Sequence, residues 1–413
     1  MEKIGFIVCQ YGNEVNGGAE IHCKMLAERL TPYYEVDVLT STIINYNTFE
    51  PYYKEGKESI NGVNVLRFKS NPFDRSYHET IRRKSKLGRK VRRMLFRVGL
   101  LELIADVFPK WNISVKSEEE VLKSHGFYSS ELLTYLSTNI NSYKKLILLS
   151  YPYPNTYFTN KIYSNKCILI PTAHNEGDLF RSLQTHLFTT VNHIAFNTEA
   201  EKKLCIKVFG KHMSDNSIVA VGVDIAKPES KAHIYKKFNL PDEYILYFGR
   251  IAPEKIGNLI NWFIAFKKSS NNNIKLVLTG RLFMKKHEHP DIIYTDFVQE
   301  SEKTALIENA RLIVNPSSKE SLSLLLLETM QLGKISLVNG KSDVMKQHCI
   351  DSNFACQYYL SKSDFLDRLN NILKNTQDTE LISEKSRKYV EENYSWDVII
   401  NKLRILIDSK TNK

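Results

Sequence analysis

The chain has no apolar run long enough to cross a bilayer, because a spanning helix needs about 18 or more mainly apolar residues. The apolar stretch that begins at Ile4 is too short for a secretory signal peptide and leads into a polar loop. The six cysteines form no Cys-x-x-Cys pair, and several of them lie in apolar, strand-like runs. We therefore expect a cytoplasmic protein with reduced, buried thiols.

Two kinds of motif that would indicate a cofactor or a metal are also missing. The loop after the first apolar segment is not a Gly-x-Gly-x-x-Gly sequence, so a nicotinamide cofactor is not indicated. The sequence contains no Asp-x-Asp, and no cluster of His, Cys or carboxylate residues has the spacing of a familiar metal site. We expect the protein to work without a cofactor or a bound metal.

Length and composition indicate a globular α/β protein. Its 413 residues are too many for one ordinary core, and 42% of them are hydrophobic and 25% charged. Short apolar segments alternate with helical stretches, which predicts βαβ units and mainly parallel sheets. The expected strands are Ile4–Cys9, Glu35–Ser41, Val63–Phe68, Lys145–Ser150, Cys167–Ala173 and His193–Asn197, and then Tyr244–Phe248, Lys275–Thr279, Ile292–Thr295, Arg311–Val314 and Ile335–Val338.

This rhythm is interrupted once, by a turn-rich stretch before Tyr244, which marks a domain boundary. We expect two Rossmann-like, doubly wound domains at residues 1–228 and 229–394, facing one another across a cleft. Residues 395–413 begin with Ser395 as a candidate N-cap and continue with an apolar face. That pattern predicts a helix, which we expect to pack back on the first domain.

The net charge of +11 is concentrated in an apparent insertion at about residues 70–130. Between Arg82 and Arg97 there are nine basic residues and no acidic one, and the rest of the chain is nearly balanced. Apolar residues recur there at helical spacing, for example at Val91 and Val98, which predicts a basic amphipathic helix. Anionic lipid headgroups are its natural partner. The alternatives are a solvated basic face on an ordinary packed helix and, less favoured, a nucleic-acid site.

Two glutamates flank an apolar run between Asn315 and Gly333. Glu328 follows four leucines, and because Glu is rarely buried without a partner, something polar should hold it. Eight residues of helix would separate Glu320 and Glu328 by about 12 Å, so they can contact opposite ends of one elongated ligand. A glycosidase is disfavoured, because its carboxylates lie about 5 to 9.5 Å apart. The alternative is that Glu320 is a helix N-terminal carboxylate and Glu328 is exposed or ion-paired.

Further candidates lie in loops that follow expected strands, where ligands of doubly wound sheets bind. Gly17 and Gly18 precede an amphipathic helix and would let backbone N–H groups approach a phosphate or a sugar. A plain tight turn explains this glycine pair equally well. His174 follows an apolar strand and is expected at the mouth between the domains, although a lone histidine is more often structural.

Two cations follow the first strand of the second half. Arg250 comes directly after Gly249, and Lys255 lies five residues later, where a helix is expected to begin near Ile256. Both side chains can converge on one anion, and a diphosphate suits that arrangement. The alternative is a surface ion pair between Glu254 and either base.

Taken in order along the chain, these residues resemble glycosyltransferase family 4. The resemblance covers nearly the whole chain and rests on Gly17-Gly-Ala-Glu20, Ala173-His174, Val221-Gly-Val-Asp224, Gly249-Arg250 with Lys255, Glu320 with Glu328, and Tyr394-Ser-Trp396. It implies the GT-B fold, with an acceptor-side N-terminal domain and a nucleotide-sugar-binding C-terminal domain. It also implies metal-independent transfer of a sugar from a nucleotide diphosphate donor, with retention of anomeric configuration.

The resemblance assigns the donor site to the second domain. Arg250 and Lys255 would hold the diphosphate, and Glu328 would bind the ribose hydroxyls. Glu320 would face the donor sugar near the reaction centre. Backbone donors would come from the adjoining loop, which contains Ser321, Leu322, Ser323 and Leu324. Stabilisation of the leaving group would then be the main catalytic effect.

In the first domain, Gly17 and Gly18 would leave room for the phosphates and the acceptor, and His174 would contact the donor sugar. Domain closure would assemble the site. The chain departs from the family at two loops, Leu337–Asp343, which lacks the usual glycine pair, and Thr279–Arg281. Neither departure removes a proposed phosphate ligand, so we expect an active enzyme with Glu320, His174, Arg250 and Lys255 as its catalytic residues.

The expected acceptor is a glycan or a lipid-linked molecule, in the synthesis of a surface polysaccharide or another glycoconjugate. The enzyme would be peripheral on the inner face of a membrane. Two alternatives stay open: a catalytically silent GT-B scaffold that partners an active transferase, and a sugar-nucleotide epimerase. Nucleic acid is not an expected partner, because the basic charge does not follow an aromatic binding face.

Overall fold

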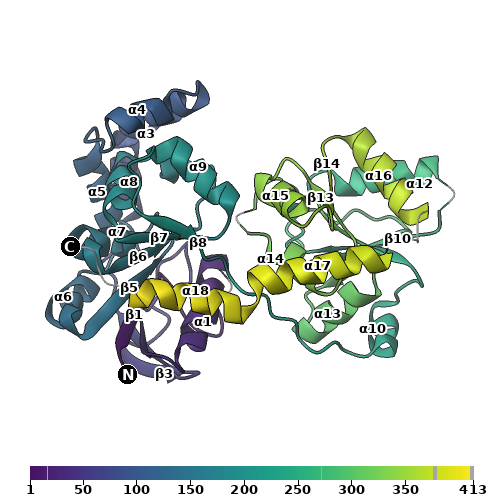
Figure 1. The fold of residues 1–413 in the computed structure, drawn as a ribbon, viewed down its shortest axis with the longest axis horizontal. Helices are drawn as coiled ribbons and strands as arrows, with labels where there is room; N and C mark the ends of the chain where they lie inside the picture. Colours follow the sequence, from purple (N-terminus) through teal and green to yellow (C-terminus); the bar gives the residue numbers. More distant parts are fainter. Residues whose placement is uncertain (16, 271, 321, 375–378, 410–413) are drawn as a thin grey trace. The chain divides into compact units, whose positions relative to one another are not determined.

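The structure is a computed structural model that describes residues 1–15, 17–270, 272–320, 322–374 and 379–409. The chain divides into two compact units (Figure 1). Unit 1 contains Met1–Val221 together with Ile400–Lys413, and unit 2 contains Gly222–Ile399. Each unit is an α/β domain with its own sheet and its own hydrophobic core.

Unit 1 is built on an eight-stranded sheet with the order β3-β4-β2-β1-β5-β6-β7-β8. All neighbouring strands are parallel except β3 and β4. The strand order reverses between β1 and β5, which is the point where ligands of such sheets bind. The strands are β1 Lys3–Ile7, β2 Glu35–Ser41, β3 Gly56–Ile60, β4 Val63–Phe68, β5 Tyr143–Leu149, β6 Cys167–Ile170, β7 His193–Phe196 and β8 Asn216–Ile218.

Helices of unit 1 connect these strands, and five of them fall between β4 and β5. The helices are α1 Gly18–Leu30, α2 Arg75–Lys84, α3 Lys86–Arg97, α4 Leu101–Val107, α5 Val115–Lys123, α6 Ser130–Asn139, α7 Pro154–Tyr163, α8 Ser182–Thr190 and α9 Glu199–Phe209. A large apolar cluster joins β5 and β6 to α7, α8 and α9. The carboxyl ends of these strands are therefore held on a rigid base.

Unit 2 is built on a six-stranded parallel sheet with the order β11-β10-β9-β12-β13-β14. Here the strand order reverses between β9 and β12, so their carboxyl ends are the expected ligand side. The strands are β9 Tyr244–Phe248, β10 Lys275–Thr279, β11 Ile292–Asp296, β12 Leu312–Asn315, β13 Ser336–Asn339 and β14 Gln357–Tyr359. The helices are α10 Lys231–Phe238, α11 Pro253–Ile256, α12 Leu259–Ser269, α13 Glu300–Asn309, α14 Leu324–Gln331, α15 Asp343–Asp351, α16 Lys362–Lys374 and α17 Thr379–Tyr394. The last helix, α18 Trp396–Asp408, belongs to unit 1 from Ile400 onward.

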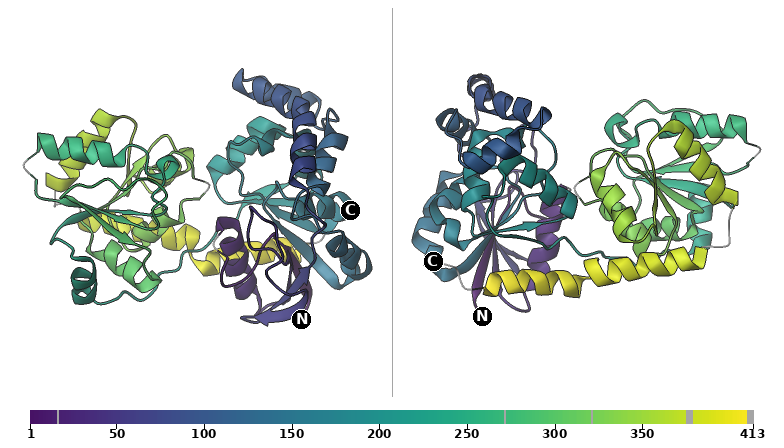
Figure 2. Two further views of the ribbon diagram at one scale, coloured as in Figure 1. Left: turned by 180° about the vertical axis from the view of Figure 1, so that it is seen from behind. Right: turned by 45° about the horizontal axis from the view of Figure 1, so that its top comes forward.

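Helices cover both faces of the unit 2 sheet, as Figure 2 shows. Ile245 and Tyr247 of β9 belong to an apolar cluster with α12 and α16. Tyr244 and Leu246 alternate with them and belong to a second cluster, with α10 and α13. Successive side chains of a strand point to opposite faces, so a strand that is apolar at every position needs helices on both sides. The doubly wound architecture is confirmed.

Every strand predicted from the sequence is present, and four of them have the predicted bounds, including Glu35–Ser41 and Tyr244–Phe248. Three strands were not predicted. β3 is an exposed antiparallel edge strand with the sequence Gly-Lys-Glu-Ser-Ile, and it has almost no apolar residue to reveal it. β8 and β14 have three residues each, which is too short for a periodic pattern to show.

The prediction of one basic helix over Arg82–Arg97 is wrong in detail. The chain forms two helices there, α2 and α3, with Ser85 at the end of α2. Arg92 is fully buried, with its Nη2 donating to the carbonyl of Val208 at 3.0 Å, and burial lowers its pKa to about 10. Arg89 lies 3.7 Å from Asp178. Part of the basic segment is therefore internal to unit 1.

All six cysteines are free and buried, as predicted. α18 starts directly after Ser395 and ends in unit 1, where Asp408 accepts hydrogen bonds from Tyr34 and Lys144 at 2.9 and 2.7 Å. Within the described ranges, no helix is both long and apolar enough to span a membrane.

Candidate functional site

The loop after β9 carries the first cation of the candidate site in unit 2. Gly249 has a φ of +137°, a conformation that glycine adopts readily and other residues rarely do. Tyr247 donates from its hydroxyl to the carbonyl of Arg250 at 2.7 Å, and Ala252 N donates to the same oxygen at 3.0 Å. These bonds fix the backbone at Arg250. Its exposed guanidinium forms no hydrogen bond or ion pair with any described residue.

The ends of β9 and β10 lie so close together that Gly280, after β10, also has to be glycine. Gly249 N donates to the carbonyl of Thr279, at the end of the neighbouring strand β10, at 3.0 Å. Gly280 follows with a φ of +129°, and a Cβ there would collide with the carbonyl oxygen of Gly249. Only glycine lets the two loops lie this close.

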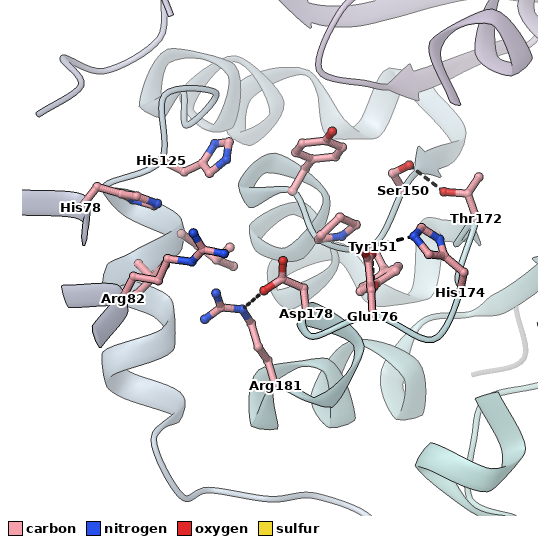
Figure 3. Close-up of a pocket in the computed structure, with 14 residues that line it drawn as sticks. His78, Arg82, His125, Ser150, Tyr151, Thr172, His174, Glu176, Asp178 and Arg181 are labelled. Carbon is pink, nitrogen blue, oxygen red and sulfur yellow. Dashed lines mark hydrogen bonds and ion pairs between the residues drawn. The ribbon is translucent and has the colours of Figure 1, made fainter. Parts of the chain in front are cut away.

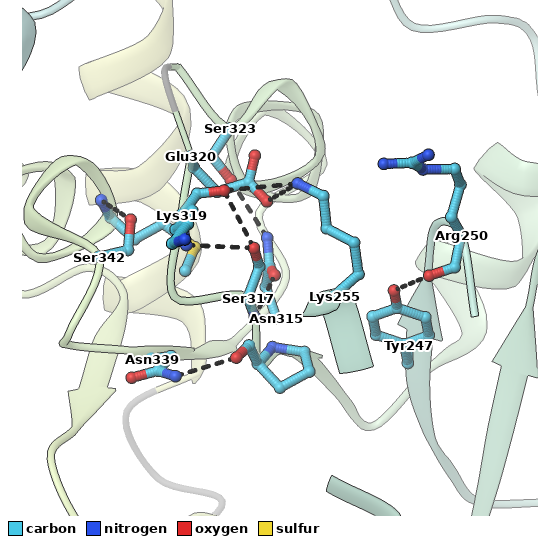
Figure 4. A network of polar contacts seen from close by, with 12 residues as sticks. Tyr247, Arg250, Lys255, Asn315, Ser317, Lys319, Glu320, Ser323, Asn339 and Ser342 are labelled. Carbon is cyan, nitrogen blue, oxygen red and sulfur yellow. Dashed lines mark hydrogen bonds and ion pairs between the residues drawn. The ribbon is translucent and has the colours of Figure 1, made fainter. Parts of the chain in front are cut away.

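Lys255 provides the second cation, from the short helix α11. The helix runs from Pro253 to Ile256 and is followed by Gly257, which has a φ of +51°, so the expected start near Ile256 is wrong. Lys255 Nζ lies 2.8 Å from Glu320 Oε1 (Figure 4). The alternative partner, Glu254, is not the one observed. Figure 4 also shows the side chain of Arg250 extending toward the side where Lys255 lies.

Glu320 lies in the loop after β12 and not on a helix. α14 begins at Leu324, so the separation expected from eight residues of helix does not apply. Asn315 organises this loop, because its side chain accepts from Ser317 N and donates to Ser323 Oγ, both at 3.2 Å. Ser323 has a φ of +62° and precedes the helix. Ser321, another candidate, lies outside the described residues.

Glu328 lies on α14 and is held by a lysine. Lys303 Nζ is 3.1 Å from Glu328 Oε1 and 2.6 Å from Glu300 Oε2. Burial raises the pKa of Glu328 and Lys303 opposes the shift, whereas for Lys303 burial is outweighed by the two carboxylates, which raise its pKa. The ammonium also lies over the ring of Phe248, at the end of β9. The expected polar partner of Glu328 is therefore a residue that the sequence did not indicate.

A buried histidine positions the loop between Glu320 and Glu328. His348 Nε2 lies 2.9 Å from the carbonyl of Leu322, and its Nδ1 lies 2.9 Å from the hydroxyl of Tyr389. Burial lowers the pKa of His348, so the neutral ring donates from Nε2 to Leu322. Leu322 is thereby anchored to α15, which carries His348, and through Tyr389 to α17.

Two sequence motifs that carry the family resemblance meet in unit 2. Val223 N donates to the carbonyl of Tyr394 at 3.0 Å, and Trp396 Nε1 donates to Asp224 Oδ1 at 2.8 Å. A Cβ on Gly222 would collide with the indole ring of Trp396. The Gly-Val-Asp segment and the Tyr-Ser-Trp segment are therefore partners in packing, which explains glycine and tryptophan at these positions.

In unit 1, Gly17 and Gly18 begin α1, after β1. Gly17 is the N-cap residue, and a Cβ there would collide with the carboxylate of Glu20, which accepts from the hydroxyl of Tyr46 at 2.5 Å. A Cβ on Gly18 would meet nothing within 4 Å. Gly17 therefore makes room for a buried carboxylate of its own helix, whereas Gly18 leaves open space beside the helix N-terminus.

His174 lies in the loop after β6 and belongs to a polar network (Figure 3). Its Nε2 is 3.2 Å from Glu176 Oε2, and Tyr151 donates to Glu176 Oε1 at 2.6 Å. The hydrogen bond to Glu176 raises the pKa of His174, with burial acting against it. The network joins the ends of β5 and β6, so His174 is a charged or readily charged group at the ligand side of the sheet.

Glu201 is a further residue that sequence reasoning missed. It is buried on α9, and its two carboxylate oxygens accept from Ala173 N and from Asn197 N. Ala173 precedes His174, so Glu201 ties the His174 loop to the end of β7. Burial raises the pKa of Glu201 to about 7, and the backbone hydrogen bonds oppose the shift. A Glu in the first turn of a helix gave no signal, because such residues are common there.

The chain is similar to known glycosyltransferases over nearly its full length. Residues 230–409 match the family model described as Glycosyl transferases group 1. An uncharacterised glycosyltransferase of Methanocaldococcus jannaschii is 23% identical, over 96% of this chain and 95% of that protein. The sucrose-phosphate synthase of Thermosynechococcus elongatus superposes with a TM-score of 0.65 over 98% of each chain, at 12% identity. Anabaena HepE in complex with UDP-glucose superposes with a TM-score of 0.65 over 99% of this chain and 100% of that one, at 11% identity.

The structural matches show the fold, and the family model falls on the unit that contains Arg250, Lys255, Glu320 and Glu328. The resemblance seen in the sequence is thus confirmed. The chain is a glycosyltransferase with the GT-B fold, and its residues 230–409 match the group 1 glycosyl transferases.

Proposed function

We propose that the enzyme transfers a sugar from a nucleotide diphosphate donor with retention of anomeric configuration, and that the donor binds in unit 2. One observation carries this proposal. Two cations follow β9, and the glutamates follow β12, so the four groups flank the point where the strand order reverses. Arg250 and Lys255 bind the diphosphate, and Glu328 accepts hydrogen bonds from the ribose hydroxyls.

The proposed chemistry depends on charge stabilisation. As the bond to the donor sugar breaks, negative charge develops on the departing diphosphate, and preorganised cations lower the barrier. Arg250 can donate two parallel hydrogen bonds, whereas Lys255 acts as a point charge. We propose that these two side chains replace a divalent metal. Glu320 faces the donor sugar, backbone N–H groups of the Leu322 to Leu324 loop contribute donors, and His174 contacts the sugar.

The first experiment is a thermal-shift screen with UDP, GDP, ADP and dTDP in the presence of EDTA. HepE was solved with UDP-glucose, so UDP is the first nucleotide to test. A ligand at 100 times its Kd should stabilise the folded protein by about 2.7 kcal/mol. One nucleotide should shift the Tm of the wild type and not that of Arg250→Ala. Absence of any shift would contradict the donor site. The anomeric configuration of the product, read by NMR, tests retention.

We further propose that the acceptor is part of a glycan or lipid-linked intermediate at a membrane, and that α3 and α4 contact anionic lipid. Leu87, Met94 and Val98 are each about 60% exposed. At 100° per residue they fall within about 40° of one another around α3. The exposed bases Lys90, Arg93 and Arg97 flank this stripe on one side.

The exposed apolar surface continues on α4, which contacts α3. Leu103 and Val107, one helical turn apart, are 64% and 68% exposed, while Leu101 and Ala105 pack inward. Apolar side chains beside basic ones are typical of helices that lie in the headgroup region of an anionic bilayer. The bound membrane would hold a lipid-linked acceptor close to the enzyme, in the synthesis of a surface polysaccharide or glycoconjugate.

A further inference from the structure

Unit 1 contains a polar cavity of about 400 Å³ at the carboxyl ends of β5 and β6 (Figure 3). Ser150 and Thr172, the side chains that line it at these two strand ends, are hydrogen-bonded to each other at 2.8 Å. Both have a positive φ, 66° and 53°, which is uncommon for residues other than glycine and is often found at functional sites. His174 lines the same wall.

The opposite wall carries two arginines whose terminal nitrogens make no hydrogen bond within the described part of the chain. Arg181 is buried, and its Nε donates to Asp178 Oδ1 at 2.6 Å. Its two terminal nitrogens form no hydrogen bond with any other described residue. The guanidinium of Arg82, on α2, likewise has no such partner in the described part of the chain. Figure 3 shows the two guanidinium groups pointing toward the same space.

The charges around this space do not cancel. Arg89 also lies near Asp178, at 3.7 Å, so two guanidinium groups are paired with this carboxylate, and Arg82 acts on it electrostatically from further away. Burial acts to raise the pKa of Asp178, but Arg181 and the other arginines hold it below its usual range, so this carboxylate is ionised. Glu176 is matched by His174. Arg82, Arg89 and Arg181 carry two more charges than Asp178, and burial raises the pKa of the neighbouring carboxylate, Glu118, to about 7, so it offsets them only in part. Like charges that face one another favour an anion between them.

A histidine adds a neutral hydrogen-bond donor. Phe127 N donates to Nδ1 of His125 at 3.2 Å, so the proton of the neutral ring is on Nε2. Burial lowers the pKa of His125 to about 4, and the ring is therefore neutral near pH 7. Nε2 has no hydrogen-bond partner among the described residues. His125 thus offers an N–H group to whatever occupies the cavity.

We propose that this cavity binds a phosphate group carried by the acceptor, with Arg82, Arg181 and His125 as its ligands. Guanidinium groups match phosphate oxygens in geometry, and two of them balance a dianion. The cavity is larger than a phosphate, so Ser150 and Thr172 can bind hydroxyls of an attached sugar. This assignment rests on the proposed function, and it makes the acceptor a phosphosugar or a lipid diphosphate sugar.

The test separates this site from the donor site. In an Arg250→Ala/Lys255→Ala background, the donor diphosphate site is lost, and inorganic phosphate binding is measured by calorimetry. Adding Arg82→Gln should weaken phosphate binding by about 10-fold or more, as loss of a charged hydrogen bond does. Arg83→Gln is the matched control, because Arg83 is the next residue on α2 and is 75% exposed. It should change nothing.

Two outcomes would overturn the assignment. One is that the Arg250→Ala/Lys255→Ala protein does not bind phosphate, and the other is that Arg82→Gln and Arg83→Gln behave alike. Arg82→Gln in the otherwise wild-type chain should bind UDP normally. This control shows that the donor site is intact when phosphate binding in the cavity is lost. Competition by glucose 6-phosphate or by a short-chain isoprenyl diphosphate in detergent then identifies the source of the phosphate. Because Arg82 is exposed, its replacement should leave the fold intact.

Discussion

Lys255 Nζ lies 2.8 Å from Glu320 Oε1, so the cation proposed to bind the donor diphosphate is ion-paired with the carboxylate proposed to face the donor sugar. Both side chains are partly buried, with 30% and 19% of their surface exposed. A diphosphate has to compete with Glu320 for this lysine. The pair therefore holds Lys255 in place before the donor arrives and gives Glu320 an effect on donor affinity as well as on transfer.

Glu320→Gln should separate these two effects. Loss of the carboxylate removes the competitor for Lys255, so UDP affinity should rise by about 2- to 5-fold, as expected for a partly exposed ion pair. Donor turnover should fall by about 100-fold or more, because the charged group near the reaction centre is lost. Calorimetry with UDP and the rate of UDP release from a UDP-sugar measure the two quantities.

Lys255→Ala should lower both affinity and turnover, and Lys268→Ala, which removes an exposed lysine of α12, should change neither. If Glu320→Gln instead weakens UDP binding as much as Lys255→Ala does, the carboxylate does not compete for the lysine. The ion pair would then be purely structural.

Glu328→Gln should weaken UDP binding by about 10-fold and leave pyrophosphate binding unchanged. The reason is that Glu328 is assigned to the ribose, and a charged hydrogen bond contributes about 1.5–3 kcal/mol. Glu300→Gln is the matched control, because it removes the other carboxylate bound to the same lysine, Lys303. That control should bind UDP normally. An equal loss for UDP and pyrophosphate would show that Glu328 acts on the whole site through Lys303.

The sequence predicted the strands and turns that carry the site better than the contacts between its side chains. Strand ends and glycines are local features, so β9, Gly249 and the position of Arg250 could be predicted from apolar runs and turn residues. The partner of Lys255 could not be predicted, because Glu320 follows a different strand, 65 residues later. Lys303 and His348 were missed for the same reason. Lys303 contacts Glu328, and His348 contacts Leu322, because helices from different parts of the chain pack together. The sequence pattern predicts the helices but not which of them pack against one another.

The basic segment shows a second limit. Charge and helical spacing predicted an amphipathic stretch, but not which bases are outside. Arg92 is inside, where its guanidinium lies near the rings of Trp111 and Phe209 and donates to the carbonyl of Val208. All three residues are distant from Arg92 in sequence. Arg82 is exposed, but it lines a cavity whose other wall comes from β5 and β6. Burial of a charge depends on tertiary partners, and composition does not reveal them.

The stability contribution of His174 and Glu176 should depend on pH. Because Glu176 raises the pKa of His174 above the unfolded value of about 6.5, this contribution is fully present below pH 6.5. It is lost as the pH rises through the higher folded pKa. The Tm difference between wild type and His174→Gln should therefore shrink above pH 6.5. The effect should be about 1 kcal/mol or less, because both side chains are partly exposed.

His212→Gln is the control for this measurement, because His212 is exposed in the same unit. Its Tm difference from the wild type should stay constant across the same pH range. A His174→Gln difference that grows with pH would mean that the neutral ring is the more stabilising form, and the Glu176 ion pair would not be the reason for its position.

Neutralising Lys90, Arg93 and Arg97 together should release the protein from anionic vesicles. Each base near such a surface contributes about 1 kcal/mol, so the triple Gln variant should bind about 100-fold more weakly to vesicles that contain phosphatidylglycerol. Cosedimentation at low salt measures this. Leu103→Ser with Val107→Ser should also weaken binding, and that loss should persist at high salt, because apolar burial is not screened.

The matched control neutralises three exposed lysines of unit 2, Lys236, Lys268 and Lys341, which changes the net charge by the same amount. If lipid binding depended only on net charge, both triple variants would lose it equally, and the apolar stripe of α3 would have no role. The specific prediction is that only the α3 variant detaches. Because Arg89 and Arg92 are held by Asp178 and Val208, replacing them should lower stability without a direct effect on vesicle binding.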